Sequence, residues 1–222
     1  MMRAFVAMTV AGMLLAGCSS SGQEATPETA PVEASPEIDL GEEGIASAAP
    51  VETYDVGRQF TLAWKEAEAT DTPEDVNITF TVTGWRCGDQ ATPYLTRGKR
   101  KYEEDYGQAS DAKVDGGYQL CVALLKVANT GKRKYQLDPV VKAVDPSAVE
   151  YDADDELTSV IGNEITRNNR ESYGSAIVSM NPRETAVTAA AFQIPADTTI
   201  ANLMIVGGSV YSEASRALVR VS

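Results

Sequence analysis

The sequence predicts an all-β domain, a two-sheet antiparallel sandwich, and three observations lead to that prediction. Between positions 76 and 82, apolar residues alternate with Asn and Thr, which is the pattern of a half-buried strand. Further short apolar segments follow, separated by residues that favour tight turns. No capped helical pattern of twelve or more residues is found in the mature domain. Many short strands joined by turns are typical of a sandwich.

The strand candidates follow one another along most of the chain. They span residues 59–64, 76–82, 118–128, 135–144, 176–180, 186–194, 200–206 and 217–221. Turn residues stand between several of them, at 129–131, 145–147, 181–182 and 195–197. Residues 153–169 are expected to form a short helix or an irregular loop.

Composition excludes several functional classes. The chain has 222 residues and a formal net charge of -13, which would repel the phosphate backbone of nucleic acids. It contains no histidine, the commonest general base and a frequent metal ligand. We therefore expect no nucleic-acid partner, no cofactor or metal, and no catalytic residues.

The N-terminal residues are expected to form an export signal. Arg3 precedes an apolar stretch at 6–15, which is too short to span a bilayer. The four residues 15–18, Leu-Ala-Gly-Cys, resemble the lipobox of bacterial lipoproteins. That resemblance implies removal of a signal peptide at 1–17, lipidation of Cys18, and a protein anchored on the extracytoplasmic face of the cell membrane. The alternative is an ordinary secretory signal followed by an unrelated cysteine.

Residues 18–53 are expected to form a disordered tether. From position 19 to position 53 there is no Lys, Arg or aromatic residue, and prolines stand at 27, 31, 36 and 50. Such a segment cannot bury a core, and its reach is roughly 30 Å. The folded domain is therefore expected to span 54–222.

One of the three cysteines is expected to carry lipid, and the other two are expected to form a disulfide. If Cys18 carries lipid, Cys87 and Cys121 remain as a pair, and thiols outside the cytoplasm tend to be oxidised. A disulfide closing this loop would stabilise the fold by roughly 3.5–4 kcal/mol. Two reduced, buried cysteines are the alternative.

Several segments resemble one family of domains. Residues 124–131, Leu137, 181–184 (Asn-Pro-Arg-Glu) and 191–195 (Ala-Phe-Gln-Ile-Pro) are similar to landmarks of the telokin-like, immunoglobulin-like domains of actinobacterial surface lipoproteins. The secreted immunogenic antigen of mycobacteria is similar in architecture. The resemblance implies an immunoglobulin-like β-sandwich at the cell surface, with molecular activity mostly unassigned. Arg183 departs from the family's usual glycine, and Trp85 precedes Cys87, unlike the antibody-type spacing.

The long segment 88–117 is expected to be an inserted loop that serves as a contact surface. It contains the sequence Gly-Lys-Arg-Lys-Tyr at 98–102, which recurs at 131–135. If the two copies meet, they form a basic patch for the phosphate or carboxylate groups of an envelope polymer or lipid. The alternative is two solvated hairpin tips. The residues proposed for this patch are Arg97, Lys99, Arg100, Lys101, Lys132, Arg133 and Lys134.

Other motifs are weaker. The acidic residues at 152 and 154–156 suggest a calcium site. However, Leu157 and Asn163 occupy the positions where an EF-hand needs Gly and Glu. Ser110 and Lys113 match the Ser-x-x-Lys pattern of penicillin-binding enzymes without its companion motifs.

The sequence thus predicts a lipid-anchored, non-catalytic binding module of the cell envelope. Its expected partners are the membrane, through the anchor, and an envelope polymer or another surface protein. The alternatives are a cell-wall hydrolase or small-ligand carrier with its site at the inserted loop, and a structural or antigenic module without a small ligand.

Overall fold

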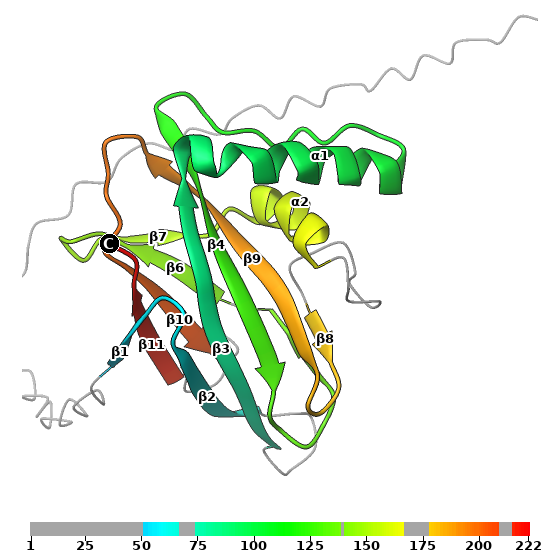
Figure 1. The fold of residues 1–222 in the computed structure, drawn as a ribbon, viewed down its shortest axis with the longest axis vertical. Helices are drawn as coiled ribbons and strands as arrows, with labels where there is room; N and C mark the ends of the chain where they lie inside the picture. Colours follow the sequence, from blue (N-terminus) through cyan, green and yellow to red (C-terminus); the bar gives the residue numbers. More distant parts are fainter. Residues whose placement is uncertain (1–50, 67–73, 139, 167–177, 209–214) are drawn as a thin grey trace, which may run out of the picture. The chain divides into compact units, whose positions relative to one another are not determined.

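The computed structural model describes residues 51–66, 74–138, 140–166, 178–208 and 215–222. The predicted signal peptide at 1–17, Cys18 and nearly all of the tether at 18–53 lie outside these residues. The described residues form two large sheets and one small one, with helices against one sheet (Figure 1). The all-β sandwich prediction is therefore confirmed. In the part of the chain that the structure describes, no helix is long and apolar enough to cross a membrane.

One sheet has four antiparallel strands in the order β2-β3-β4-β9. These are β2 (Gln59–Glu66), β3 (Glu74–Cys87), β4 (Tyr118–Asn129) and β9 (Thr185–Pro195). The other has the order β1-β11-β10-β6-β7, and its strand β1 runs parallel to β11. These are β1 (Glu52–Asp55), β11 (Ser215–Arg220), β10 (Asn202–Gly207), β6 (Val140–Val144) and β7 (Glu150–Asp152).

The strand predicted at 135–144 is two strands. β5 (Tyr135–Leu137) pairs with β8 (Val178–Met180), whereas β6 joins the five-stranded sheet. The sequence between β5 and β6 contains proline at 139, which has no amide N–H to donate to a ladder. The chain therefore changes sheets where the apolar pattern alone suggested one continuous strand.

The main core lies between the two large sheets. The predicted alternation in β3 places Ile78, Phe80 and Val82 fully inside. Val82 then pairs with Leu125 and Gly84 with the adjacent Leu124, so Thr83 is the extra residue of a β-bulge. Beyond the bulge the inward positions shift by one residue. Trp85 consequently points inward and contacts Phe192 edge to face, with ring centroids 5.6 Å apart.

A second core lies on the outer face of the four-stranded sheet, where α1 (Thr92–Tyr106) and α2 (Asp155–Ile165) pack. Leu157, Val160 and Ile161 of α2 pack against apolar residues of β4 and alanines of β9. Asp154 caps α2, as its Oδ1 accepts a hydrogen bond from Leu157 N at 2.9 Å. The short helix expected within 153–169 is confirmed.

The expectation that 88–117 is a loop is wrong. A short 3₁₀ helix, η1 (Gly88–Gln90), leads into the fifteen-residue helix α1. The helix ends at Gly107, whose φ of 68° is the left-handed conformation common just beyond helix ends. Two features hid the helix: a run of charges and a glycine at its centre. That glycine, Gly98, is required by packing, because a Cβ there would lie 2.7 Å from the Val160 carbonyl oxygen.

Cys87 and Cys121 form a disulfide, as predicted. They are directly opposed across β3 and β4, with their Cα atoms 4.1 Å apart. The bond lies immediately before η1 and therefore closes the base of the segment that carries α1.

Candidate anion-binding surface

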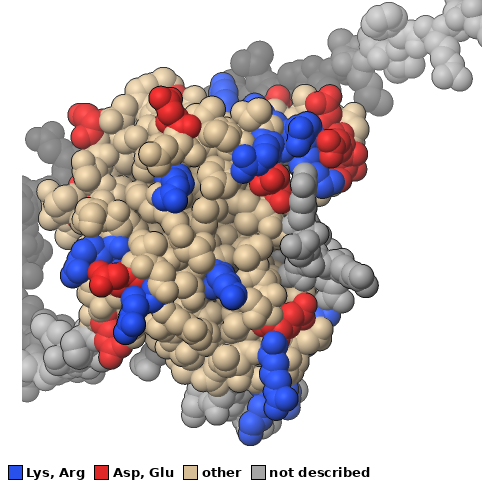
Figure 2. All heavy atoms as spheres, in the orientation of Figure 1, with Lys and Arg blue, Asp and Glu red and all other residues tan. Residues whose placement is uncertain are grey.

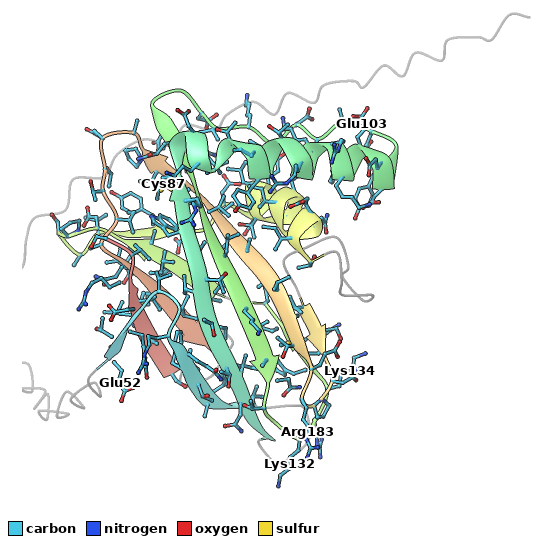
Figure 3. All side chains as sticks on the ribbon, viewed as in Figure 1. Glu52, Cys87, Glu103, Lys132, Lys134 and Arg183 are labelled. Atoms are coloured by element: carbon cyan, nitrogen blue, oxygen red, sulfur yellow. A yellow bond between two sulfur atoms is a disulfide. The ribbon has the colours of Figure 1, made fainter. Side chains whose placement is uncertain are left out.

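The structure separates the two Gly-Lys-Arg-Lys-Tyr copies. The first copy lies within α1, and the second lies in the turn between β4 and β5. Helix α1 follows Cys87, which pairs with the first residues of β4, whereas the turn follows Asn129 at the other end of that strand. Figure 3 shows Glu103 of α1 at one end of the domain and Lys132 and Lys134 at the other. The seven predicted residues therefore do not form one patch.

Most of the basic side chains of the helical copy are paired with carboxylates. Arg97 Nε lies 3.1 Å from Glu164 Oε1 of α2, and the guanidinium also lies over the Tyr94 ring. Arg100 faces Glu104 at 3.7 Å, and Lys101 pairs with Asp105 one turn along the helix. These carboxylates offset the positive charge locally, which lowers the attraction of α1 for an external anion.

A buried asparagine organises the second copy. Asn129 is 1% exposed, and its Nδ2 donates to the carbonyl oxygens of Arg133 at 2.6 Å and Met180 at 3.0 Å. Its Oδ1 accepts from Gly131 N at 3.0 Å. Gly131 N also lies 3.2 Å from the Asn77 carbonyl oxygen. The turn that carries these basic residues is therefore fixed from within the fold.

Arg183 joins the second copy, and sequence reasoning did not include it. It lies in the turn between β8 and β9, and its backbone N–H donates to the Asn129 carbonyl oxygen at 2.7 Å. Figure 3 shows Arg183, Lys132 and Lys134 at the same end of the domain. We call Lys132, Arg133, Lys134 and Arg183 the basic tip. Antiparallel pairing of β4 with β9 brings the two turns together, and that pairing is the signal that could have identified Arg183.

The carboxylate nearest in sequence to the basic tip is already engaged. Glu184 Oε2 accepts from Asn181 N at 2.8 Å and from Asn181 Nδ2 at 3.1 Å, closing its own turn. Neither Lys132 nor Arg183 forms an ion pair with a residue that the structure describes. These two cations are thus exposed to solvent, without a carboxylate partner among the described residues.

A cavity of about 500 Å³ opens between α1, α2 and residues 108–111. Its lining includes Tyr102 and the carboxylates Asp111, Asp155 and Glu156. Ser110 also lines it, but the Ser110 hydroxyl accepts from the nearby Ala112 N–H, and Lys113 is not part of the lining. The match to a penicillin-binding motif therefore has no structural counterpart.

Two residues of the acidic segment 152–156 have partners within the fold. Asp152 lies 3.2 Å from Lys142 Nζ, and Asp154 Oδ2 accepts from Gln193 Nε2 at 2.8 Å. Partial burial and the Asp155 carboxylate raise the pKa of Asp138, which follows β5. Within the described ranges, no group of three or more His, Cys, Asp or Glu side chains is placed to hold a metal ion.

Comparisons with known proteins give similarity at the level of architecture. No protein-family model matches the chain, and no curated protein matches it. An uncharacterized β-sandwich protein from Clostridium difficile is similar at 10% identity and a TM-score of 0.40, over 78% of this chain and 95% of that one. The secreted protein MPT63 from Mycobacterium tuberculosis is similar at 9% identity and a TM-score of 0.40, over 78% and 99%. A conserved hypothetical protein from Bacillus anthracis is similar at 16% identity and a TM-score of 0.34, over 71% and 97%.

Proposed function

We propose that this chain is a lipid-anchored module on the extracytoplasmic face of the cell membrane, and that it binds an anionic envelope component without catalysing a reaction. The observation that carries the binding role is the basic tip. On a chain with a net charge of -13, Lys132 and Arg183 are cations without a carboxylate partner among the described residues. A local basic site on an acidic molecule attracts anions and repels other basic surfaces.

The proposed location is supported by the cysteines. The disulfide between Cys87 and Cys121 is a bond that persists in oxidising compartments. It leaves Cys18 as the third cysteine, within the lipobox-like sequence. Metabolic labelling of the native host with palmitate should label the protein, and a Cys18→Ser variant should remain unlabelled. Equal labelling of the two would contradict the anchor.

The binding role is tested by charge reversal at the two Gly-Lys-Arg-Lys-Tyr copies. The protein carrying Cys18→Ser is captured on an immobilised anionic cell-wall polymer, with a neutral polysaccharide as the control matrix. Lys132→Glu with Arg183→Glu should weaken capture by about tenfold or more, because the variant removes two attractions and adds two repulsions.

The matched control is Lys99→Glu with Arg100→Glu on α1, which makes the same change in net charge. It should alter capture by less than about twofold if the site is local. Equal losses in both variants would mean that net charge alone decides capture, and unchanged capture in the tip variant would refute the site. Thermal unfolding monitors the fold of each variant.

A second candidate function, a cell-wall hydrolase, is favoured by the carboxylates between the helices. Asp111, Asp155 and Glu156 line the cavity, and the Asp155 carboxylate helps to raise the pKa of Asp138, which lies outside the lining; a carboxyl group with a raised pKa has the property that a general acid needs. Incubation with cell-wall polymer should then release reducing ends, and Asp155→Asn should abolish that release. Absence of release by the wild-type protein would rule against this candidate.

A further inference from the structure

We infer that the outer face of the four-stranded sheet continues the basic tip as a track for one linear polyanion, an extended chain of phosphate or carboxylate groups. This inference rests on the proposed function and specifies the partner's form. The half of the face that the helices leave uncovered is called the open face. Its accessible residues are Thr61, Thr81, Lys126, Ala128, Thr185 and Val187, and the nearly buried Thr79 lies among them.

Strand pairing defines the open face. Its residues stand opposite one another in rows, such as Thr79 beside Ala128 and Lys126 beside Val187. Further along β4, Leu120 and Val122 point to the same side but are buried beneath the helices. The helical layer therefore ends along β4, and the open face lies between that layer and the basic tip.

The charged side chains that the structure describes on this face all have one sign. Lys126 is exposed, and Arg86 at the far end of β3 is exposed as well. No carboxylate stands among the side chains that the structure describes on this face between Arg86 and the basic tip. Figure 2 shows the middle of the face as largely uncharged, with single basic side chains and with acidic side chains toward the rim.

Arg86 is held flat on the sheet. Its Nη1 donates to the Trp85 carbonyl oxygen at 2.9 Å. Its Cζ lies 3.7 Å from where a Cβ of Gly84 would be, so the guanidinium extends over a residue without a side chain. In the part of the chain that the structure describes, neither Arg86 nor Lys126 has an ion-pair partner. Both cations remain available to an external anion.

The spacing of these charges fits an extended ligand. Arg86 stands opposite Val122, four residues before Lys126 on β4, and Asn129 follows three residues later. At about 3.3 Å per residue, the track measures roughly 23 Å from Arg86 to the end of β4, where the basic tip begins. Thr81 and Thr185 provide hydroxyl groups on this face, whereas the hydroxyls of Thr61 and Thr79 bond to each other at 2.9 Å. Such a surface favours a chain of regularly spaced anions over a compact ligand.

The experiment uses inorganic polyphosphate of graded chain length as the probe and measures the affinity of the protein carrying Cys18→Ser at several salt concentrations. Wild-type affinity should rise with chain length until the probe spans the track. Lys126→Ala and Arg86→Ala should each weaken binding of long chains by about fivefold. Each should also reduce the dependence of log affinity on log salt by roughly 0.7. Triphosphate, which reaches the basic tip alone, should bind both variants like the wild type.

The matched control is Arg216→Ala on β11, which removes an exposed arginine from the outward side of the other large sheet. It should leave the affinity for long chains within about twofold of wild type. If Lys126→Ala and Arg86→Ala bind long polyphosphate as tightly as the wild type does, the inferred track is overturned. The proposed function would survive that result if Lys132→Glu with Arg183→Glu still weakened binding by about tenfold or more. If the tip variant also bound normally, both proposals would fall.

Vesicles of anionic phospholipid separate a polymer from a membrane surface. The track predicts that Lys126→Ala changes vesicle binding less than it changes polyphosphate binding, because a planar bilayer does not follow one strand. A larger effect on vesicles than on long polyphosphate would overturn the inference and assign the open face to the membrane.

Discussion

The Gly-Lys-Arg-Lys-Tyr copies at 98–102 and 131–135 have the same five residues and opposite environments. In α1, acidic residues lie four positions after Arg100 and Lys101 and form intrahelical pairs with them. In the β4–β5 turn, the backbone is instead fixed by the buried Asn129, and the neighbouring turn contributes Arg183. The comparison teaches that the flanking residues, and not the motif, decide which of its cations pair with a neighbouring carboxylate: Arg100 and Lys101 do so in α1, whereas Lys132 has no such partner among the described residues.

The largest expected effect concerns the asparagine that holds the turn copy. Asn129→Ala removes three hydrogen bonds and leaves the buried carbonyl oxygen of Met180 without this donor. We expect the free energy of unfolding to fall by about 3 kcal/mol, measured by urea denaturation.

The matched control for that change is Asn181→Ala in the adjacent turn. The Asn181 side chain is exposed and bonds to Glu184 at 3.1 Å. Its loss should cost less than about 1 kcal/mol. Similar costs for the two asparagines would show that the turn copy is not held from within the fold.

Gly98 and Gly131 begin the two copies, and changing each to alanine compares how tightly the two sites are packed. At Gly98 a Cβ would lie 2.7 Å from the Val160 carbonyl oxygen, so α1 must move away from α2. We expect Gly98→Ala to destabilise the protein by about 1–3 kcal/mol, even though alanine favours helices by about 1 kcal/mol.

At Gly131 the nearest atom to a new Cβ is Asn129 Oδ1 at 3.1 Å. Gly131→Ala should cost less than about 1 kcal/mol, since a side-chain oxygen can shift by a few tenths of an ångström. Thermal unfolding of the two variants side by side checks the ranking. Stabilisation by Gly98→Ala would mean that α1 does not depend on this close approach.

The smallest expected effect on the free energy of unfolding concerns Asp138, which follows β5. Burial and Asp155 raise the pKa of Asp138, so folding favours its neutral form. Any stability from this group is present below its unfolded pKa of about 3.9 and is lost as pH rises through the folded pKa. Asp138→Asn should therefore stabilise the protein at pH 7 by less than about 1 kcal/mol, because the group is partly exposed.

Urea denaturation at neutral pH and near pH 3 measures this difference. The gain should vanish at the lower pH, and it should shrink in an Asp155→Asn background, where one source of repulsion is absent. A gain of equal size at both pH values would assign the effect to packing instead of charge.

Local patterns predicted much of the sandwich and little of the site. The alternation in β3 depends on a two-residue period that the sequence displays, and the Cys87–Cys121 bond followed from cysteine count and compartment. Helix α1 was missed because its apolar residues are few and Gly98 interrupts them, and the reason for that glycine lies in α2. Arg183 was missed because its relation to Lys132 arises from strand pairing between turns far apart in sequence. Lipidation of Cys18 remains a prediction.

The bulge at Thr83 in β3 allows the disulfide between Cys87 and Cys121 to form. With a strict two-residue period, position 87 would face the helices, whereas Cys121 faces the interior between the sheets. The bulge takes up the one extra residue and so turns Cys87 toward its partner. A chain without Thr83 could pair as a regular ladder and still place Cys87 opposite Cys121, whereas the present sequence brings the two sulfurs together only through the bulge.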